Sequence, residues 1–282
     1  MNWSQEVICS RQNRTVVELC KLSDRKAREA RCSFRFDGIK LLEEAVRNRL
    51  ALELVAFRES SAERIGRAYS EWCESTNFEG AKRILVLSDE LFDKISEEKS
   101  PEGVICVAKY IDKFQKNITI YNSADFLKLK NERIVLVESV RDPSNIGAII
   151  RSAAALGVDR LIMSSDCADI YHPRAVRASM GTLFNQPIDR VDDLAQVIAQ
   201  LRGTGRRVYA AALDPSAKRL GSFAISEHDT VVIGNEGHGL TDETIAACDA
   251  CVMIPMSDRA ESFNAAVAAS LLMWEFVGKT TV

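Results

Sequence analysis

The chain has 282 residues, 46% of them apolar, and a formal net charge of −3. This length suggests two domains that each bury a core, and the weak negative charge does not indicate a nucleic-acid binder. No run of 18 apolar residues occurs, and no basic segment followed by an apolar run opens the chain. We therefore expect no membrane span, no secretory signal and a cytoplasmic location.

The first 110 residues alternate between helical and strand patterns. Helices are expected at 14–32, 38–50, 60–76 (capped by serines) and 89–96, and strands at 34–36, 51–57, 83–87 and 103–108. This alternation predicts a small α/β domain over residues 1–110. It has no glycine-rich phosphate loop, so we interpret it as a recognition or scaffolding domain.

Positive charge is concentrated near the N-terminus. Residues 21–35 hold six basic and two acidic side chains, so this stretch is a candidate for phosphate contacts. A solvated helix face is the alternative interpretation. Residues 111–130 are polar and weakly patterned, and we place a linker there between the first domain and a second one at 131–282.

The second domain begins with an apolar run at 133–138 that is typical of a central parallel strand. Pro143 suits the first turn of the following helix and Gly157 its C-terminal end. Asn145 and Arg151 are six residues apart, so they do not share one face of a regular helix. If Asn145 lies in a loop before the helix proper, both can still reach the edge of the sheet. Further strands are expected at 159–164, 185–188, 206–213, 230–234 and 251–254, and helical segments at 172–181, 192–201 and from about 263.

Two loops of this domain look suited to binding a ligand. Gly234-Asn-Glu-Gly-His-Gly-Leu240 lets the backbone turn sharply and approach a ligand closely, but its glycine spacing differs from the dinucleotide fingerprint. Ser262 and Asn264 stand at the entrance of the last helix, where backbone N–H groups are free. A simple helix cap is the alternative interpretation.

The eight cysteines are scattered, which favours reduced thiols in a cytoplasmic compartment over a disulfide framework. Cys248 and Cys251 form a lone Cys-x-x-Cys pair, and a structural zinc site would need a second pair. We expect no metal, and we interpret Cys251 as a small buried strand residue.

Three stretches of the second domain resemble the SpoU/TrmH family of SPOUT RNA 2′-O-ribose methyltransferases. They are Asp142-Pro-x-Asn-x-Gly-x-x-x-Arg-x-Ala-x-x-x-Gly157, Gly234-Asn-Glu-Gly-x-Gly-Leu240, and Ile254-Pro-Met with Glu261-Ser-x-Asn-x-x-Val-Ala-Ala269. The segment 174–181 is also similar, and the first domain more loosely resembles the family's substrate-binding domain. Phe263 replaces the family's usual Leu, and Ser257-Asp258 replaces a glycine-containing loop.

The resemblance implies a trefoil-knotted α/β domain, a homodimer, and S-adenosylmethionine as cofactor. It places the cofactor on Leu213, Gly234, Asn235, Glu236, Gly237, Ile254, Met256, Ser262 and Asn264. The reaction it implies is methyl transfer to a ribose 2′-hydroxyl of RNA, with ribosomal RNA favoured over transfer RNA.

By the same resemblance, Arg151 is the central catalytic residue, assisted by Asn145, Glu236, Ser262 and Asn264. Arginine has a pKa above about 12, so we prefer a role in contacting the hydroxyl and a phosphate and stabilising negative charge. A base role primed by phosphate contact stays open.

RNA backbone contacts are expected at Arg25, Lys26, Arg28, Arg174 and Arg177. Three alternatives remain: the same chemistry on transfer RNA, a catalytically silent RNA-binding protein of this fold, and a nucleotide-binding α/β enzyme such as a dehydrogenase.

Overall fold

The computed structural model describes residues 6–111, 121–226, 228–257, 259 and 262–278. The chain forms two compact units, Met1–Lys116 with Tyr171–Asn185, and Asn117–Ile170 with Gln186–Val282. Each is described by itself. The boundaries 1–110, 111–130 and 131–282 remain our proposal for the domains, and within this division the segment Tyr171–Asn185 belongs to the first unit.

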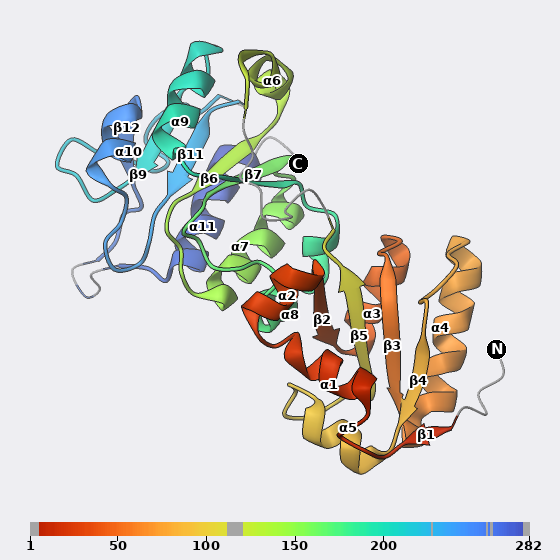
Figure 1. Ribbon diagram of the computed structural model, residues 1–282. Coiled ribbons are helices and arrows are strands. Elements are labelled where there is room, and N and C mark those ends of the chain that lie inside the picture. The colour runs from red at the N-terminus through yellow and green to blue at the C-terminus, as the bar shows by residue number, and fades with distance from the viewer. Residues whose placement is uncertain (1–5, 112–120, 227, 258, 260–261, 279–282) are drawn as a thin grey trace. The chain divides into compact units, whose positions relative to one another are not determined.

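The first unit is built on a five-stranded sheet in the order β1-β4-β3-β5-β2 (Figure 1). β1, β4 and β3 are parallel, and β5 runs antiparallel to both β3 and β2. Its strands are β1 Val7–Ile8, β2 Ser33–Asp37, β3 Leu52–Arg58, β4 Ile84–Leu87 and β5 Val104–Lys109. Its helical segments are α1 Arg14–Lys21, α2 Arg25–Arg31, α3 Ile39–Arg47, η1 Glu59–Ser61, α4 Ala62–Thr76, α5 Asp89–Ile95, α8 Pro173–Ser179 and η3 Thr182–Phe184.

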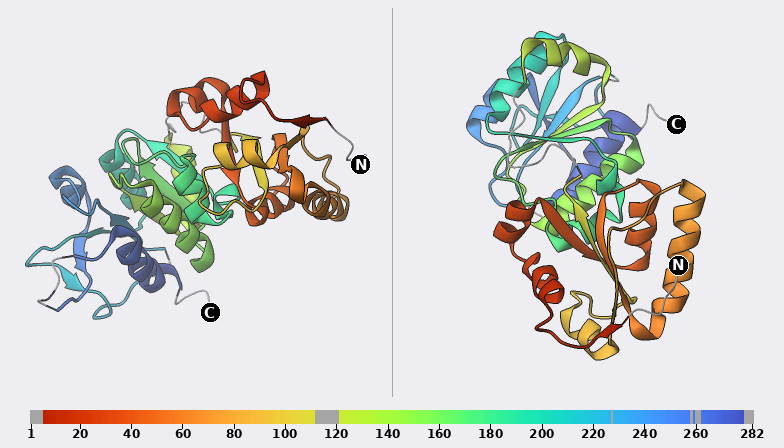
Figure 2. Two further views of the ribbon diagram at one scale, coloured as in Figure 1. Left: turned by 90° about the horizontal axis from the view of Figure 1, so that it is seen from below. Right: turned by 45° about the vertical axis from the view of Figure 1, so that its right-hand side comes forward.

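Both faces of this sheet are covered by helices (Figure 2). Side chains of α1 and α5 share one core cluster with Leu54 and Ala56 of β3. On the opposite face, Phe57 of β3 meets Tyr69 of α4, with ring centroids 6.1 Å apart. This alternation along one strand is what a sheet buried on both faces requires.

Two expected helices differ in detail. The segment 14–32 is two helices, because Asp24 accepts a hydrogen bond from Ala27 N at 3.2 Å and starts a new helix. Ser61 precedes α4 without capping it through its side chain; its hydroxyl donates instead to the carbonyl of Arg58.

Aromatic stacking holds the segment Tyr171–Asn185 in the first unit. The rings of Tyr110 and Tyr171 stack with centroids 4.0 Å apart, and Phe34 of β2 lies 4.8 Å from Tyr171. Phe184 packs on Phe36 at 5.4 Å. These contacts lie on either side of α8, which begins at Pro173 and buries Ala175 and Val176.

The second unit contains a seven-stranded, all-parallel sheet in the order β10-β12-β9-β11-β6-β7-β8. Its strands are β6 Ile134–Val137, β7 Arg160–Ser164, β8 Ile188–Val191, β9 Val208–Ala211, β10 Lys218–Arg219, β11 Thr230–Ile233 and β12 Ala250–Met253. Its helical segments are α6 Ser123–Lys128, η2 Leu129–Asn131, α7 Pro143–Leu156, α9 Leu194–Gly203, α10 Asp242–Ala247, α11 Ala265–Met273 and the π-helical turn η4 Trp274–Gly278.

Helices cover both faces of the second sheet (Figure 2). α7 and α11 pack together on one face, where the hydroxyls of Ser152 and Ser270 lie 2.8 Å apart. α6, α9 and α10 share the other face, as Figure 1 shows. β6 and β11 are buried along their whole length, as expected of central parallel strands.

Most predicted elements of the second unit are present, and two differ from the prediction. Pro143 opens α7 and Gly157 ends it with a φ of 77°, both as predicted. The strand predicted at 185–188 is β8, at 188–191, because Pro187 has no N–H for the ladder and its carbonyl accepts from Leu161 N. α6 was missed in the weak pattern at 111–130, although Phe126 is buried.

The last helix begins at Ala265, two residues later than expected, because Asn264 caps it. In the described part of the chain, no helix is long and apolar enough to cross a membrane.

Candidate active site

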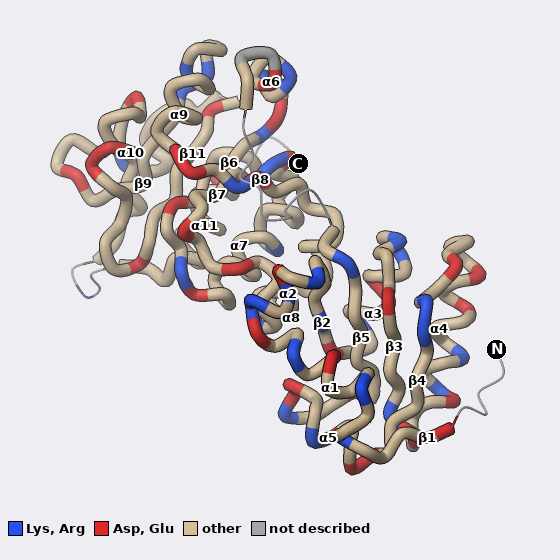
Figure 3. The backbone as a smooth tube through the Cα atoms, in the orientation of Figure 1, with Lys and Arg blue, Asp and Glu red and all other residues tan. Residues whose placement is uncertain are grey.

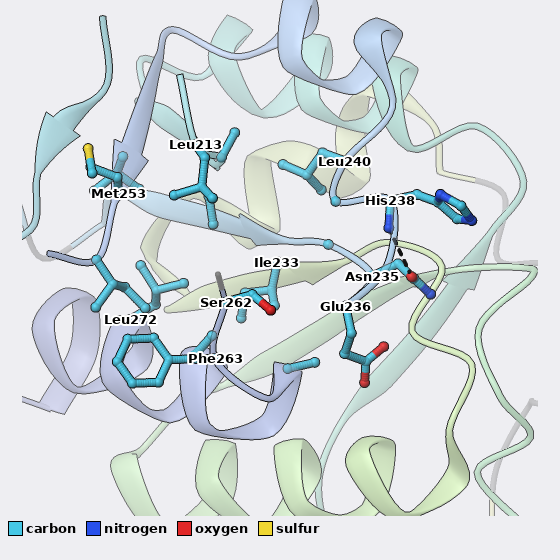
Figure 4. Close-up of a pocket in the computed structure, with 18 of the residues that line it drawn as sticks. Leu213, Ile233, Asn235, Glu236, His238, Leu240, Met253, Ser262, Phe263 and Leu272 are labelled. Atoms are coloured by element: carbon cyan, nitrogen blue, oxygen red, sulfur yellow. Dashed lines mark hydrogen bonds between the residues drawn. The ribbon is translucent and has the colours of Figure 1, made fainter. Parts of the chain in front are cut away.

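A pocket of about 570 Å³ lies at the carboxyl ends of β9, β11 and β12 (Figure 4). This is where open parallel sheets bind their ligands, and its volume suits a small molecule. The loops after these three strands all contribute walls. The lining residues expected from sequence are Leu213, Gly234, Asn235, Glu236, Gly237, Ile254, Met256 and Ser262.

Further lining residues are not predicted by the sequence: Asp242 and Ile245 come from α10, and Leu272 from the last helix. Leu240 and Phe263 also line the pocket, and both belong to stretches that carry the family resemblance. Met253 ends β12. Their helical or strand positions gave no signal of their own, because only the folded sheet brings them to one cavity. Figure 4 shows the imidazole of His238 directed away from the apolar side chains of Leu213 and Met253.

The glycine-rich loop between β11 and α10 is closely packed on itself. Asn235 and Gly239 exchange two backbone hydrogen bonds, and Asn235 Oδ1 accepts from Gly237 N at 2.7 Å and His238 N at 3.3 Å. A Cβ on Gly234 would lie 2.5 Å from the carbonyl carbon of Gly239. No side chain fits there, so this position requires glycine.

Asn235 also ties the loop to the end of β6. Its Nδ2 donates to the carbonyl of Ser139 at 2.7 Å. Ser139 has a φ of 54°, and its hydroxyl donates to Asp166, which also accepts from Ser164. Burial alone would raise the pKa of Asp166, but the hydrogen bonds from Ser139 and Ser164 lower it on balance.

Three polar residues from the three motifs form one hydrogen-bonded chain. Asn264 Nδ2 donates to Asn145 Oδ1 at 3.0 Å, and Asn145 Nδ2 donates to Glu236 Oε1. Glu236 lines the pocket, so this chain reaches from α7 and the start of α11 to the ligand cavity. Asn264 is not itself part of the wall; its Oδ1 accepts from the first turn of α11.

Arg151 lies on α7 and is exposed to solvent. It makes no hydrogen bond or ion pair with any residue that the structure describes. Asn145 does not lie in a loop before the helix, because α7 starts at Pro143 and Asn145 is in its first turn. The two side chains therefore point in different directions from one helix, and the structure does not join Arg151 to the Asn145 chain.

The candidate RNA-binding residues all belong to the N-terminal unit, where Figure 3 shows basic and acidic residues intermixed along the helices. Arg25 and Lys26 are exposed on α2, Arg25 pairing with Glu29 at 2.8 Å. Arg174 and Arg177 are exposed on α8, and Arg177 pairs with Glu98 at 3.0 Å.

Arg28 does not fit its predicted role in contacting the RNA backbone. Its side chain is buried, with 1% exposure, and donates to the carbonyls of Leu22 and Ser23. The guanidinium supports the turn between α1 and α2, so it is not available to a phosphate.

All eight cysteines are free. Burial raises the pKa of Cys248 to about 12, so this thiol stays protonated and unreactive near neutral pH. Cys251 is half-buried and packs against the core rather than being fully buried. Among the described residues, no group of three or more His, Cys, Asp or Glu side chains is placed to hold a metal ion.

Both halves of the chain match known protein families. Residues 132–274 match the SpoU rRNA Methylase family, and residues 13–106 match the MRM3-like substrate binding domain. The 23S rRNA (guanosine(2553)-2′-O)-methyltransferase RlmP of Bacillus subtilis is 26% identical over 95% of this chain and 98% of its own length. The 23S rRNA (uridine(2479)-2′-O)-methyltransferase of Streptomyces viridochromogenes is 32% identical over 75% of this chain and 72% of its own.

Solved structures share the whole fold. The SpoU methyltransferase AviRb from Streptomyces viridochromogenes, in complex with the cofactor AdoMet, superposes with a TM-score of 0.75 at 26% identity, covering 96% of this chain and 99% of that one. An RNA 2′-O ribose methyltransferase gives a TM-score of 0.79 at 23% identity, covering 98% and 100%. The fold and the pocket thus define a methyltransferase of the SPOUT class. The chain belongs to the SpoU rRNA methylase family.

Proposed function

We propose that this chain methylates a ribose 2′-hydroxyl of ribosomal RNA, with S-adenosylmethionine as its cofactor. Its family and the named activities of its relatives support the reaction. The observation that carries the proposal is the hydrogen-bonded chain of Asn264, Asn145 and Glu236, which brings one residue from each motif to the edge of the pocket.

The pocket residues fit this cofactor. Apolar side chains such as Leu240, Met253 and Leu272 provide walls for an adenine ring and a methionine chain. The carboxylates of Glu236 and Asp242 line the same cavity and suit a ligand that carries a sulfonium and an ammonium group. The bound cofactor would supply an activated methyl group. The protein then has to bind the two substrates, orient them and stabilise the charge that develops.

We assign roles to the residues by their contacts. Asn145 is held from both sides by Glu236 and Asn264, so its amide is fixed and can orient a ribose next to the pocket. Arg151 is exposed and unpaired within the described chain, so it is free to contact the RNA hydroxyl and its neighbouring phosphate. A guanidinium there stabilises the negative charge that develops on the oxygen. Ser262 lines the pocket, next to the last helix, and would position the cofactor.

RNA binding is assigned to the N-terminal unit. Arg25, Lys26, Arg174 and Arg177 are exposed there, and this unit contains the match to a substrate-binding domain. Cationic side chains of this kind bind the phosphate backbone without reading the bases.

We also propose that the enzyme is a cytoplasmic homodimer. Val267, Leu271 and Trp274 form an apolar stripe along the last helix, and they are 47%, 39% and 46% exposed. Large apolar side chains repeated on one helical face and left in solvent indicate a protein interface. The eight free cysteines support a reducing compartment.

The test is methyl transfer from labelled S-adenosylmethionine to unmodified ribosomal RNA and, in parallel, to unmodified transfer RNA. We expect label in ribosomal RNA, at one ribose that becomes resistant to alkaline cleavage. The Arg151→Ala variant should bind the cofactor normally and transfer no label. Label in transfer RNA alone would show that the substrate is transfer RNA and not ribosomal RNA. Cofactor binding without methyl transfer to either RNA would contradict the proposed activity.

A further inference from the structure

We propose that Glu138 is a positioning residue for the cofactor pocket, because it anchors the far end of the glycine-rich loop and the start of α10. The inference rests on the proposed function only in naming S-adenosylmethionine as the ligand of that pocket. Glu138 does not line the cavity and would act through the residues that it holds.

Glu138 directly follows β6 and is almost fully buried, with 6% exposure. Its Oε2 accepts from Thr241 N at 2.8 Å, and its Oε1 accepts from Thr241 Oγ1 at 3.0 Å and from Thr244 Oγ1. A buried carboxylate that accepts three hydrogen bonds is fixed in position, and it fixes the positions of Thr241 and Thr244 as well.

The donors of Glu138 alternate with residues of the pocket wall. Leu240 comes just before Thr241, Asp242 lies between the two threonines, and Ile245 follows Thr244; all three line the pocket. A shift of Thr241 or Thr244 therefore moves the wall. Thr241 is also the N-cap of α10, since its hydroxyl accepts from Thr244 N at 3.2 Å.

Glu138 and Ser139, two consecutive residues after β6, hold the two ends of the glycine-rich loop. Ser139 accepts from Asn235 Nδ2 near the start of the loop, and Glu138 holds Thr241 just after its end. The backbone N–H of Glu138 also donates to the carbonyl of Ile233 at 2.8 Å, directly before Gly234. The shape of the loop is thus set by β6, which lies next to β11 in the sheet.

A carboxylate suits position 138 because both of its oxygens accept hydrogen bonds in this contact. The Thr241 hydroxyl already accepts from Thr244 N, which favours its proton pointing to Glu138. A glutamine would turn an NH₂ group towards at least one of these donors. The Glu138→Gln variant keeps the size of the side chain and disturbs only this contact.

The experiment compares S-adenosylmethionine binding by calorimetry for the full-length wild type, Glu138→Gln, Thr244→Val and the double variant. The control is Asp229→Asn, which alters another buried carboxylate of the same unit at the start of β11. Asp229 is 4% exposed and accepts from Arg207 Nη2 at 2.6 Å and Ser226 N at 2.9 Å.

We expect Glu138→Gln to raise the Kd roughly tenfold and Thr244→Val about threefold, as loss of a charge-assisted hydrogen bond would. The double variant should bind no worse than Glu138→Gln, because both changes remove one shared contact. Asp229→Asn should leave the Kd within about twofold of wild type, even if it lowers the melting temperature as much as Glu138→Gln does. The KM for RNA should stay unchanged in all variants.

A Kd for Glu138→Gln within about twofold of wild type would overturn the inference, as would an equal rise in the Asp229→Asn control. Should Glu138→Gln fail to fold, the Thr244→Val result decides alone, since valine preserves the shape of the buried side chain. A wild-type protein that binds no S-adenosylmethionine would instead overturn the cofactor assignment in the proposed function, which this design separates from a failure of the Glu138 contact.

Discussion

Asn264 Nδ2 donates a 3.0 Å hydrogen bond to Asn145 Oδ1 and so connects two motifs that are 119 positions apart in the chain. The same Asn264 uses its Oδ1 to accept from Ala266 N and Val267 N at the start of α11. One amide thus caps a helix and fixes a neighbour that reaches Glu236 and the pocket. Mutation can separate the role of the amide oxygen, which caps the helix, from the role of the amide nitrogen, which bonds Asn145.

Asn264→Asp should keep the helix cap and lose the bond to Asn145. An aspartate still accepts from the helix N–H groups, but it has no proton to donate to Asn145. We expect kcat to fall roughly 10²-fold with little change in melting temperature, because the Asn145 amide, to which we assign the orienting of the ribose, is misplaced. Asn264→Ala should in addition destabilise the protein by about 1 kcal/mol. Thermal denaturation and single-turnover rates measure the two effects, and an active Asp variant would contradict the role of the bond.

Gly234→Ala should abolish tight cofactor binding, whereas Gly237→Ala should not. The new Cβ at Gly234 would lie 2.5 Å from the carbonyl carbon of Gly239 and 2.8 Å from Leu240 N, so the loop has to open. At Gly237 the nearest atom is Asn235 Oδ1, at 3.4 Å. Calorimetry with S-adenosylmethionine should show a Kd raised more than about tenfold for the first variant, since the loop loses its preorganised shape. Equal Kd values for the two variants would show that the loop does not shape the pocket.

Replacing both Arg25 and Lys26 by Ala should weaken RNA binding and flatten its salt dependence. Each lost phosphate contact lowers the slope of log K against log salt by about 0.7–0.9. The matched change Arg28→Ala should behave differently. It removes a buried guanidinium that bonds the carbonyls of Leu22 and Ser23, so stability falls by about 1–3 kcal/mol. Filter binding over a salt series and thermal melts separate the two; an unchanged slope would make this patch a solvated face.

Leu271→Glu should convert the proposed homodimer to a monomer. It puts a charge in the centre of the apolar stripe formed with Val267 and Trp274, and a buried unpaired charge is strongly unfavourable at an interface. Leu127→Glu on α6 is the control, because Leu127 is a single apolar side chain with 68% exposure. Sedimentation velocity at several protein concentrations measures the outcome. A monomeric wild type would refute the homodimer, and a dimeric Leu271→Glu variant would place its interface elsewhere.

The Asp166 carboxylate should contribute to acid sensitivity. Its pKa in the fold lies below the usual value of 3.8, because hydrogen bonds from Ser139 and Ser164 outweigh the effect of burial. Its stabilising contribution is therefore present above pH 3.8 and is lost as the pH falls through the lowered pKa. Urea midpoints measured from pH 6 to pH 3 should fall less steeply for Asp166→Asn than for wild type. Identical slopes would show that this group does not titrate with folding.

The local sequence determined much of the second unit. Pro143 and Gly157 mark the ends of α7 because the backbone preferences of proline and glycine are local and do not depend on tertiary contacts. The apolar runs at β6 and β11 predict strands, and the run at β6 predicts a central one, since burial on both faces needs no polar alternation. The motif at 234–240 indicates a tight ligand loop, because only glycine permits its close backbone approach.

Tertiary structure alone decided which side chains meet. Nothing local indicates that Arg28 is buried, that Glu138 collects the hydroxyls of Thr241 and Thr244, or that Tyr171 stacks on Tyr110. The contacts of Glu138 and Tyr171 depend on how the sheets assemble, because their partners lie tens to more than a hundred positions away. Arg28 bonds carbonyls only five and six positions away, but its burial depends on how the turn between α1 and α2 packs. Sequence patterns within one element fix its type and its ends, but the partners across the sheet edge exist only once the sheet has formed.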